Sequence, residues 1–143
     1  MAKSKAIFTL QSYGIYSTWD SNTKALPQIA QFTTQVQAAI DVEFGLIIHV
    51  KKGKGEKLQY CIYHPDIPDQ HGEIMPPFSG YVYVKDSDWQ FYLGDTIWPP
   101  LENKLGDWRM TIAHNGSIIA DKTFTLFKAK QRSEEDFWQN KRR

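Results

Sequence analysis

The feature that most constrains this chain is a two-residue alternation of apolar and polar side chains that recurs along most of its length. The alternation is cleanest from residue 43 to residue 51, where Phe44, Leu46, Ile48 and Val50 share one parity. Because successive side chains of a β-strand point to opposite faces, this period indicates a strand with one buried face. No long segment carries the 3.6-residue period of an amphipathic helix. The pattern therefore predicts an all-β protein.

Residues that favour loops separate the members of two pairs of alternating runs. Lys52-Gly53-Lys54-Gly55 lies between the first strand and a returning run at residues 58–63. Asp86-Ser87-Asp88 lies between the runs 81–84 and 89–93. Because tight turns use Gly, Asp and Ser, we expect a β-hairpin at both places.

The sharpest turn signal is Asn115-Gly116, which lies between residues 108–113 and a last strand that ends at Leu126. Asn-Gly suits a type I′ turn because both residues tolerate a positive φ. Together with runs at residues 6–18 and 32–41, the chain contains about seven short strands. Strands at this spacing favour an antiparallel β-sandwich over an open barrel.

Length, charge and cysteine content narrow the class further. A chain of 143 residues suits one domain, so we expect a sandwich at residues 1–128 followed by a basic tail at 129–143, helical or disordered. The net charge of +1 argues against nucleic acid as a partner. Cys61 is the single cysteine, which excludes an internal disulfide. With no secretory signal and no apolar run of the roughly 20 residues that span a bilayer, we expect a cytoplasmic protein without membrane insertion.

Residues near the end of the predicted sandwich resemble the last two strands of immunoglobulin-like domains. The stretch Gly106-Asp107-Trp108-Arg109-Met110-Thr111-Ile112 places Trp108 at the corner aromatic position. Immunoglobulin domains proper carry a cysteine two residues after that aromatic, where this chain has Met110. The resemblance implies an immunoglobulin-like sandwich in which packing, with Phe44 or Leu46 on the earlier strand, replaces the inter-sheet disulfide.

Over almost its whole length the chain also resembles a family of uncharacterised gammaproteobacterial proteins, a domain of unknown function. The segments that carry this resemblance are FGLIIHVKKGKGEKLQYCIYHPDIPD, PPFSGYVYV and WQFYLGDTIWPP. The resemblance implies a bacterial origin, and it implies no activity and no catalytic residue.

The densest group of potential metal ligands lies in a Pro-rich segment between predicted strands. It holds two imidazoles and three carboxylates, from His64, Asp66, Asp69, His71 and Glu73. Nitrogen and oxygen ligands suit Zn²⁺ or another divalent ion, so one hypothesis is a small metal-dependent hydrolase. The spacing matches no metal motif, and Asp and Pro are also the residues of an ordered surface loop. We favour the loop and expect no cofactor.

Aromatic residues supply a second candidate site. Alternation sends Trp89 and Phe91 to one face of their strand and Tyr92 to the other, so we expect Tyr92 and Trp98 to be exposed. Large exposed aromatics are enriched in recognition sites, and sugar rings also stack on them. A carbohydrate-binding module is therefore another alternative. Cys61 lies within an alternating strand and is interpreted as a buried structural thiol.

The leading interpretation is a non-catalytic binding module for a protein or peptide partner. Stiff loops at residues 64–78 and 95–102 suit recognition, and no catalytic constellation can be assembled from the sequence. The binding residues expected at this loop end are His64, Asp66, Asp69, His71, Tyr92 and Trp98. Exposed sheet edges would also permit a homodimer formed by strand addition.

Overall fold

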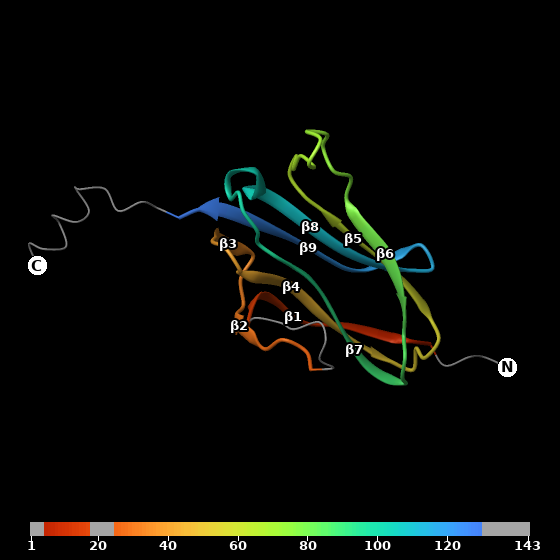
Figure 1. Ribbon diagram of the computed structural model, residues 1–143. Coiled ribbons are helices and arrows are strands. Elements are labelled where there is room, and N and C mark those ends of the chain that lie inside the picture. Colours follow the sequence, from red (N-terminus) through yellow and green to blue (C-terminus); the bar gives the residue numbers. More distant parts are fainter. Residues whose placement is uncertain (1–4, 18–24, 130–143) are drawn as a thin grey trace, which may run out of the picture.

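Among the described residues, nine β-strands in two facing sheets make up nearly all of the regular structure (Figure 1). The computed structural model describes residues 5–17 and 25–129. Within this part of the chain the strands are β1 (Ile7–Tyr16), β2 (Ile29–Gln31), β3 (Gln35–Ala38), β4 (Glu43–Lys51), β5 (Lys57–Tyr63), β6 (Phe78–Tyr83), β7 (Asp88–Thr96), β8 (Gly106–His114) and β9 (Ser117–Lys128). One 3-10 turn, η1 (Glu102–Lys104), precedes β8. The predicted all-β sandwich is confirmed.

The strand order is β2-β1-β4-β7 in the first sheet and β3-β9-β8-β5-β6 in the second. Of the predicted strand at residues 32–41, only Gln35–Ala38 forms a strand, β3; the short strand β2 ends just before this range, and the two belong to different sheets. Thr33 lies at the crossing, where its hydroxyl accepts a hydrogen bond from the Gln35 amide at 3.0 Å. β3 then runs parallel to β9, so the sandwich is antiparallel in every strand pair but one.

Of the three predicted hairpins, the structure contains the last. β8 pairs with β9, and Asn115 and Gly116 have φ values of +50° and +81°, as a type I′ turn requires. The prediction of hairpins at β4–β5 and β6–β7 is wrong, because each connection crosses from one sheet to the other. The strands on either side of a connection show the same alternation whether the connection is a hairpin or a crossing between sheets, because in both cases their apolar faces point into one core.

The two crossing connections lie side by side and are hydrogen-bonded to each other. The Lys52 amide donates to the Ser87 carbonyl, and the Gly55 amide donates to the Val84 carbonyl, both at 2.8 Å. These bonds satisfy backbone groups that a hairpin would have paired within itself. The two predicted loops are therefore present, and only the predicted pairing of the strands that they connect is wrong.

Aromatic side chains from both sheets meet in the core between them. Phe44 of β4 is fully buried, and its ring lies 5.4 Å from that of Trp108 on β8 and 5.6 Å from that of Phe124 on β9. Both pairs have the edge-on geometry that aromatic rings favour. Met110 is buried in the same cluster. Packing thus takes the place of the inter-sheet disulfide, as the immunoglobulin resemblance implied.

The sandwich ends with β9 at Lys128, and the expected basic tail lies outside the described residues except for Ala129. Within residues 5–17 and 25–129, no helix is long and apolar enough to cross a membrane.

We expect Phe44→Ala to lower the free energy of unfolding by about 3–5 kcal/mol, because it removes a buried ring and leaves a cavity between the sheets. Phe32→Ala is the matched control: its ring is 60% exposed, so its loss is expected to be about 1 kcal/mol or less. Urea denaturation followed by tryptophan fluorescence measures both. Equal losses in the two variants would contradict the central role of Phe44.

Candidate functional site

Two loops meet at one end of the sandwich, next to the core. The first joins β5 to β6 and contains His64, whose ring lies 4.5 Å from that of Phe78. The second joins β7 to β8 and contains Trp98, whose ring lies 6.4 Å from Phe78 and 6.2 Å from Trp108. The structure therefore brings together the two loop segments that the sequence singled out. We refer to this region as the loop end.

His64 is engaged by the backbone of its own loop. Its Nδ1 lies 2.6 Å from the carbonyl oxygen of Pro65, and its Nε2 lies 2.9 Å from that of Pro76. Both ring nitrogens thus face backbone acceptors. The imidazole joins the two ends of the loop, and neither nitrogen is left as a free metal ligand.

The remaining residues of the proposed metal group are spread along the same loop. Asp69 Oδ1 accepts hydrogen bonds from the amides of His71 at 2.8 Å and Glu73 at 3.0 Å, as a loop-stabilising aspartate does. Asp66, His71 and Glu73 are exposed. No three His, Cys, Asp or Glu side chains in the described ranges gather closely enough to hold one metal ion. This geometry gives no support to the metal-site hypothesis, and the hydrogen bonds of Asp69 are those of an ordered loop.

The aromatic candidates also separate. Tyr92 is only 6% exposed and packs with Tyr16 and Ile47 in a small cluster apart from the main core. Trp98 is half-buried against the main core. The prediction that both are exposed is wrong for Tyr92, and the two rings form no common platform for a sugar. The strand parity of Tyr92 was correct, but residues 26–29 cover that outer face with Leu26 and Ile29.

Tyr92 takes part in a buried polar network that sequence reasoning missed. Its hydroxyl donates to Oε2 of Glu43, and the Thr96 hydroxyl donates to Oε1 of the same carboxylate at 2.5 Å. Glu43 itself is buried. Desolvation, followed by the hydrogen bond to Glu43, raises the pKa of Tyr92. The alternation of β4 placed Glu43 on the outer parity, which predicted exposure and gave no signal of this network.

Asp95 is a carboxyl group with a raised pKa, and it lies beside the loop end. It follows Leu93 on the inward parity of β7. Burial is the main cause that raises its pKa to about 6, and the charge of Glu43 adds to this. The hydrogen bond from the Thr96 amide and the charge of His64 act in the opposite direction. A carboxylate on the apolar parity of a strand was the sequence signal that could have identified it.

Lys104 holds the second loop in place. Its Nζ donates to the carbonyl oxygen of Pro100 at 3.1 Å and to Oδ1 of Asn103 at 2.6 Å, and it lies 4.4 Å from the centre of the Trp98 ring. Its backbone carbonyl accepts a hydrogen bond from Nε1 of Trp108 at 2.8 Å. Desolvation lowers the pKa of this buried ammonium group. These contacts fix the loop against the core.

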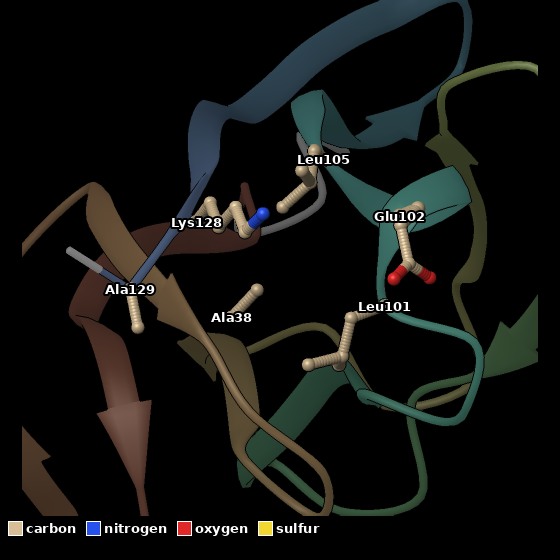
Figure 2. A pocket seen from close by; sticks show the side chains of 6 residues that line it. All are labelled: Ala38, Leu101, Glu102, Leu105, Lys128 and Ala129. Atoms are coloured by element: carbon tan, nitrogen blue, oxygen red, sulfur yellow. The ribbon is translucent and has the colours of Figure 1, made fainter. Parts of the chain in front are cut away.

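The ordered loop forms one wall of an apolar pocket. Figure 2 shows Leu101, Leu105 and Lys128 around an opening with Ala38 at its base. The pocket has a volume of about 220 Å³ and is open to solvent. Its lining residues come from β3, the β7–β8 loop and the end of β9: Ala38, Leu101, Glu102, Leu105, Lys128 and Ala129. Leu101 and Glu102 fall within the loop 95–102 that the sequence singled out, but none of the six was named as a binding residue. An apolar residue before a 3-10 turn is as typical of a core as of a pocket, so the sequence carried no specific signal.

Cys61 departs from its predicted environment. It is half-buried on β5, on the parity opposite to the buried Leu58 and Ile62. Its hydrogen bond is the largest of the effects that raise the pKa of the neighbouring Tyr63. The interpretation of Cys61 as a buried core thiol is therefore wrong.

The fold and the aromatic core together define an immunoglobulin-like β-sandwich. Among solved structures, the chain is similar to an immunoglobulin-like protein from Pseudomonas aeruginosa, with a TM-score of 0.71 over 89% of this chain and 100% of that chain. The two sequences are 19% identical, so the similarity shows a shared fold.

The chain belongs to the family described as "Domain of unknown function (DUF3859)", which matches residues 4–126. The resemblance to a bacterial domain of unknown function is thereby confirmed. A search of curated proteins finds no significant match.

The raised pKa of Asp95 predicts a pH-dependent stability. Because the folded protein binds the Asp95 proton more tightly than the unfolded chain, the associated stability is present below about pH 4 and is lost as the pH rises through about 6. The loss is expected to reach about 2–3 kcal/mol. Asn resembles the protonated carboxyl group and does not titrate. The free energy of unfolding of Asp95→Asn, relative to that of the parent protein, should therefore increase when the pH is raised from about 4.5 to about 7.5. Urea unfolding at both pH values measures the difference, and a pH-independent difference would contradict the assignment.

Proposed function

We propose that this protein is a non-catalytic binding module, and that the pocket at the loop end receives one apolar side chain of a peptide segment in a protein partner. The observation that carries the proposal is the pocket itself, an open apolar hollow whose wall is held by Lys104 and Trp98. A rigid wall lowers the entropy lost on binding, since the loop need not be ordered by the partner.

The size of the pocket favours a side chain over a free small molecule. Pockets for cofactors and drug-sized ligands are usually about 300–1,000 Å³, which is larger than this one. The volume of about 220 Å³ equals that of roughly seven liquid waters, which is the space of one large apolar side chain. Burying such a side chain contributes on the order of 1.5–3 kcal/mol.

The charged residues at the pocket suit a peptide. Lys128 lines one side and Glu102 the other, and both are exposed. They therefore offer a donor and an acceptor to the backbone on either side of an inserted side chain, without favouring a strongly charged partner. Among the expected binding residues, Trp98 contacts Lys104, which holds the loop of the pocket wall. His64 and Asp69 stabilise the adjacent loop through hydrogen bonds. Cytoplasmic location stays a prediction from the sequence.

A phage-displayed library of random peptides tests the proposal with the full chain as bait. We expect the enriched peptides to share one large apolar residue. Leu101→Asp, which places a carboxylate in the pocket wall, should weaken their binding by about tenfold or more, as fluorescence anisotropy with a labelled peptide would measure.

The matched control is Ile118→Asp, which makes the same chemical change at a residue that is exposed at the opposite end of β8 and β9. Its peptide affinity should stay within about twofold of the parent protein. Peptides that bind both variants equally well, or a library that yields no enriched peptide, would overturn the proposed function.

A further inference from the structure

The second sheet has an edge, on the side opposite the pocket, that pairs with no further strand among the described residues. β6 is the last strand of that sheet, and in the described part of the chain it pairs with β5 alone. Figure 1 shows β6 along the outer border of the molecule. An edge strand presents unpaired amide and carbonyl groups, which are a template for another strand.

The hydrogen bonds at the end of β6 show which residues direct their backbone outward. The Val84 amide donates to the Glu56 carbonyl, and the Val84 carbonyl accepts from the Gly55 amide, both at 2.8 Å. Val84 therefore directs both of its polar groups to the side of β5. Because these groups alternate between the two sides of a strand, Ser79, Tyr81 and Tyr83 direct theirs to the free edge.

β6 lacks the features that usually protect an edge. The strand Phe78–Tyr83 has no charged residue and no proline. The other edge strands of the described sheets differ: β2 and β3 have three and four residues, and β7 carries Asp88 and Asp95. A charged residue on an edge strand disfavours pairing with a further strand, and β6 has none, so pairing of two β6 strands brings no like charges together.

We propose that a second copy of this chain adds to the β6 edge, so that two β6 strands pair antiparallel about a two-fold axis at Tyr81. In this register Tyr81 pairs with Tyr81 of the second copy, and Ser79 pairs with Tyr83. All the outward-directed backbone groups of β6 then find partners, and the interface is self-complementary, as two-fold symmetry requires.

The same register also matches the faces of the two strands. Residues 79, 81 and 83 lie on the outer face of the sheet, where Tyr81 is 59% exposed and Tyr83 is 52% exposed. A shift by one residue would oppose outer and inner side chains. In the proposed register the exposed rings of both copies form one continuous aromatic row, and aromatic cross-strand neighbours stabilise a sheet.

Sedimentation velocity of the full chain, from about 1 to about 500 µM, tests the proposal. We expect a reversible monomer–dimer equilibrium. Tyr81→Pro removes the central outward amide, which an edge strand tolerates, and should weaken the dimer by at least about tenfold. Tyr81→Thr keeps that amide and serves as the matched control, with a smaller change. Circular dichroism and the thermal midpoint establish that each variant is folded.

A charge exchange tests the register and does not depend on a proline. Ser79→Lys or Tyr83→Glu alone changes the net charge of each copy and leaves the new charge opposite an uncharged residue. The double variant Ser79→Lys/Tyr83→Glu places opposite charges face to face twice, so its dimer should be tighter than that of either single variant, and more so at low salt. A protein that is monomeric at all concentrations, or a dimer that neither Tyr81→Pro nor the charge exchange alters, would overturn the proposal. A monomer that instead binds an added extended peptide at β6 would overturn it in favour of a heterologous partner.

Discussion

The contact of Phe44 with Trp108 and Phe124 is the interaction on which the rest of this structure depends. It joins β4, an interior strand of the first sheet, to β8 and β9, two interior strands of the second. Immunoglobulin domains proper secure the same place with a disulfide, which a chain with one cysteine cannot form. Here the hydrophobic and aromatic terms alone hold the sheets together, and such packing works in a reducing compartment as well as in an oxidising one.

The loop end is an extension of that core. Trp108 contacts both Phe44 and Trp98, and its indole N–H donates a hydrogen bond to the carbonyl oxygen of Lys104. Lys104 in turn fixes the loop that carries Leu101 into the pocket wall. The position of the pocket is thus set by side chains that are themselves anchored between the sheets. The proposed binding surface is therefore ordered by the core itself, which lowers the entropy that binding would cost.

Two surfaces with different chemistry therefore follow from one sandwich. The pocket offers apolar side-chain burial at the loop end, and the β6 edge offers backbone hydrogen bonds along a sheet. Because they occupy different parts of the molecule, strand addition at β6 would leave the pocket open and would present two pockets on one dimer. Two linked sites bind a repeated or dimeric partner more tightly than one site does. The immunoglobulin-like fold itself hosts many functions, so these sites and not the fold carry the functional argument.

Alternation by itself determined the all-β class and the inward parity of Phe44, Leu46, Ile48 and Val50, and the Asn115-Gly116 turn determined the β8–β9 hairpin, because these features depend on neighbours within a few residues. The Asp and Pro content of residues 64–73 likewise indicated a loop. Only the tertiary structure decided which strands share a sheet, since a crossing and a hairpin leave the same local pattern. It also decided that Tyr92 is covered, that Glu43 is buried, and that Leu101 faces a pocket. Those outcomes depend on segments distant in sequence, and no local periodicity records which distant segment lies against a given face.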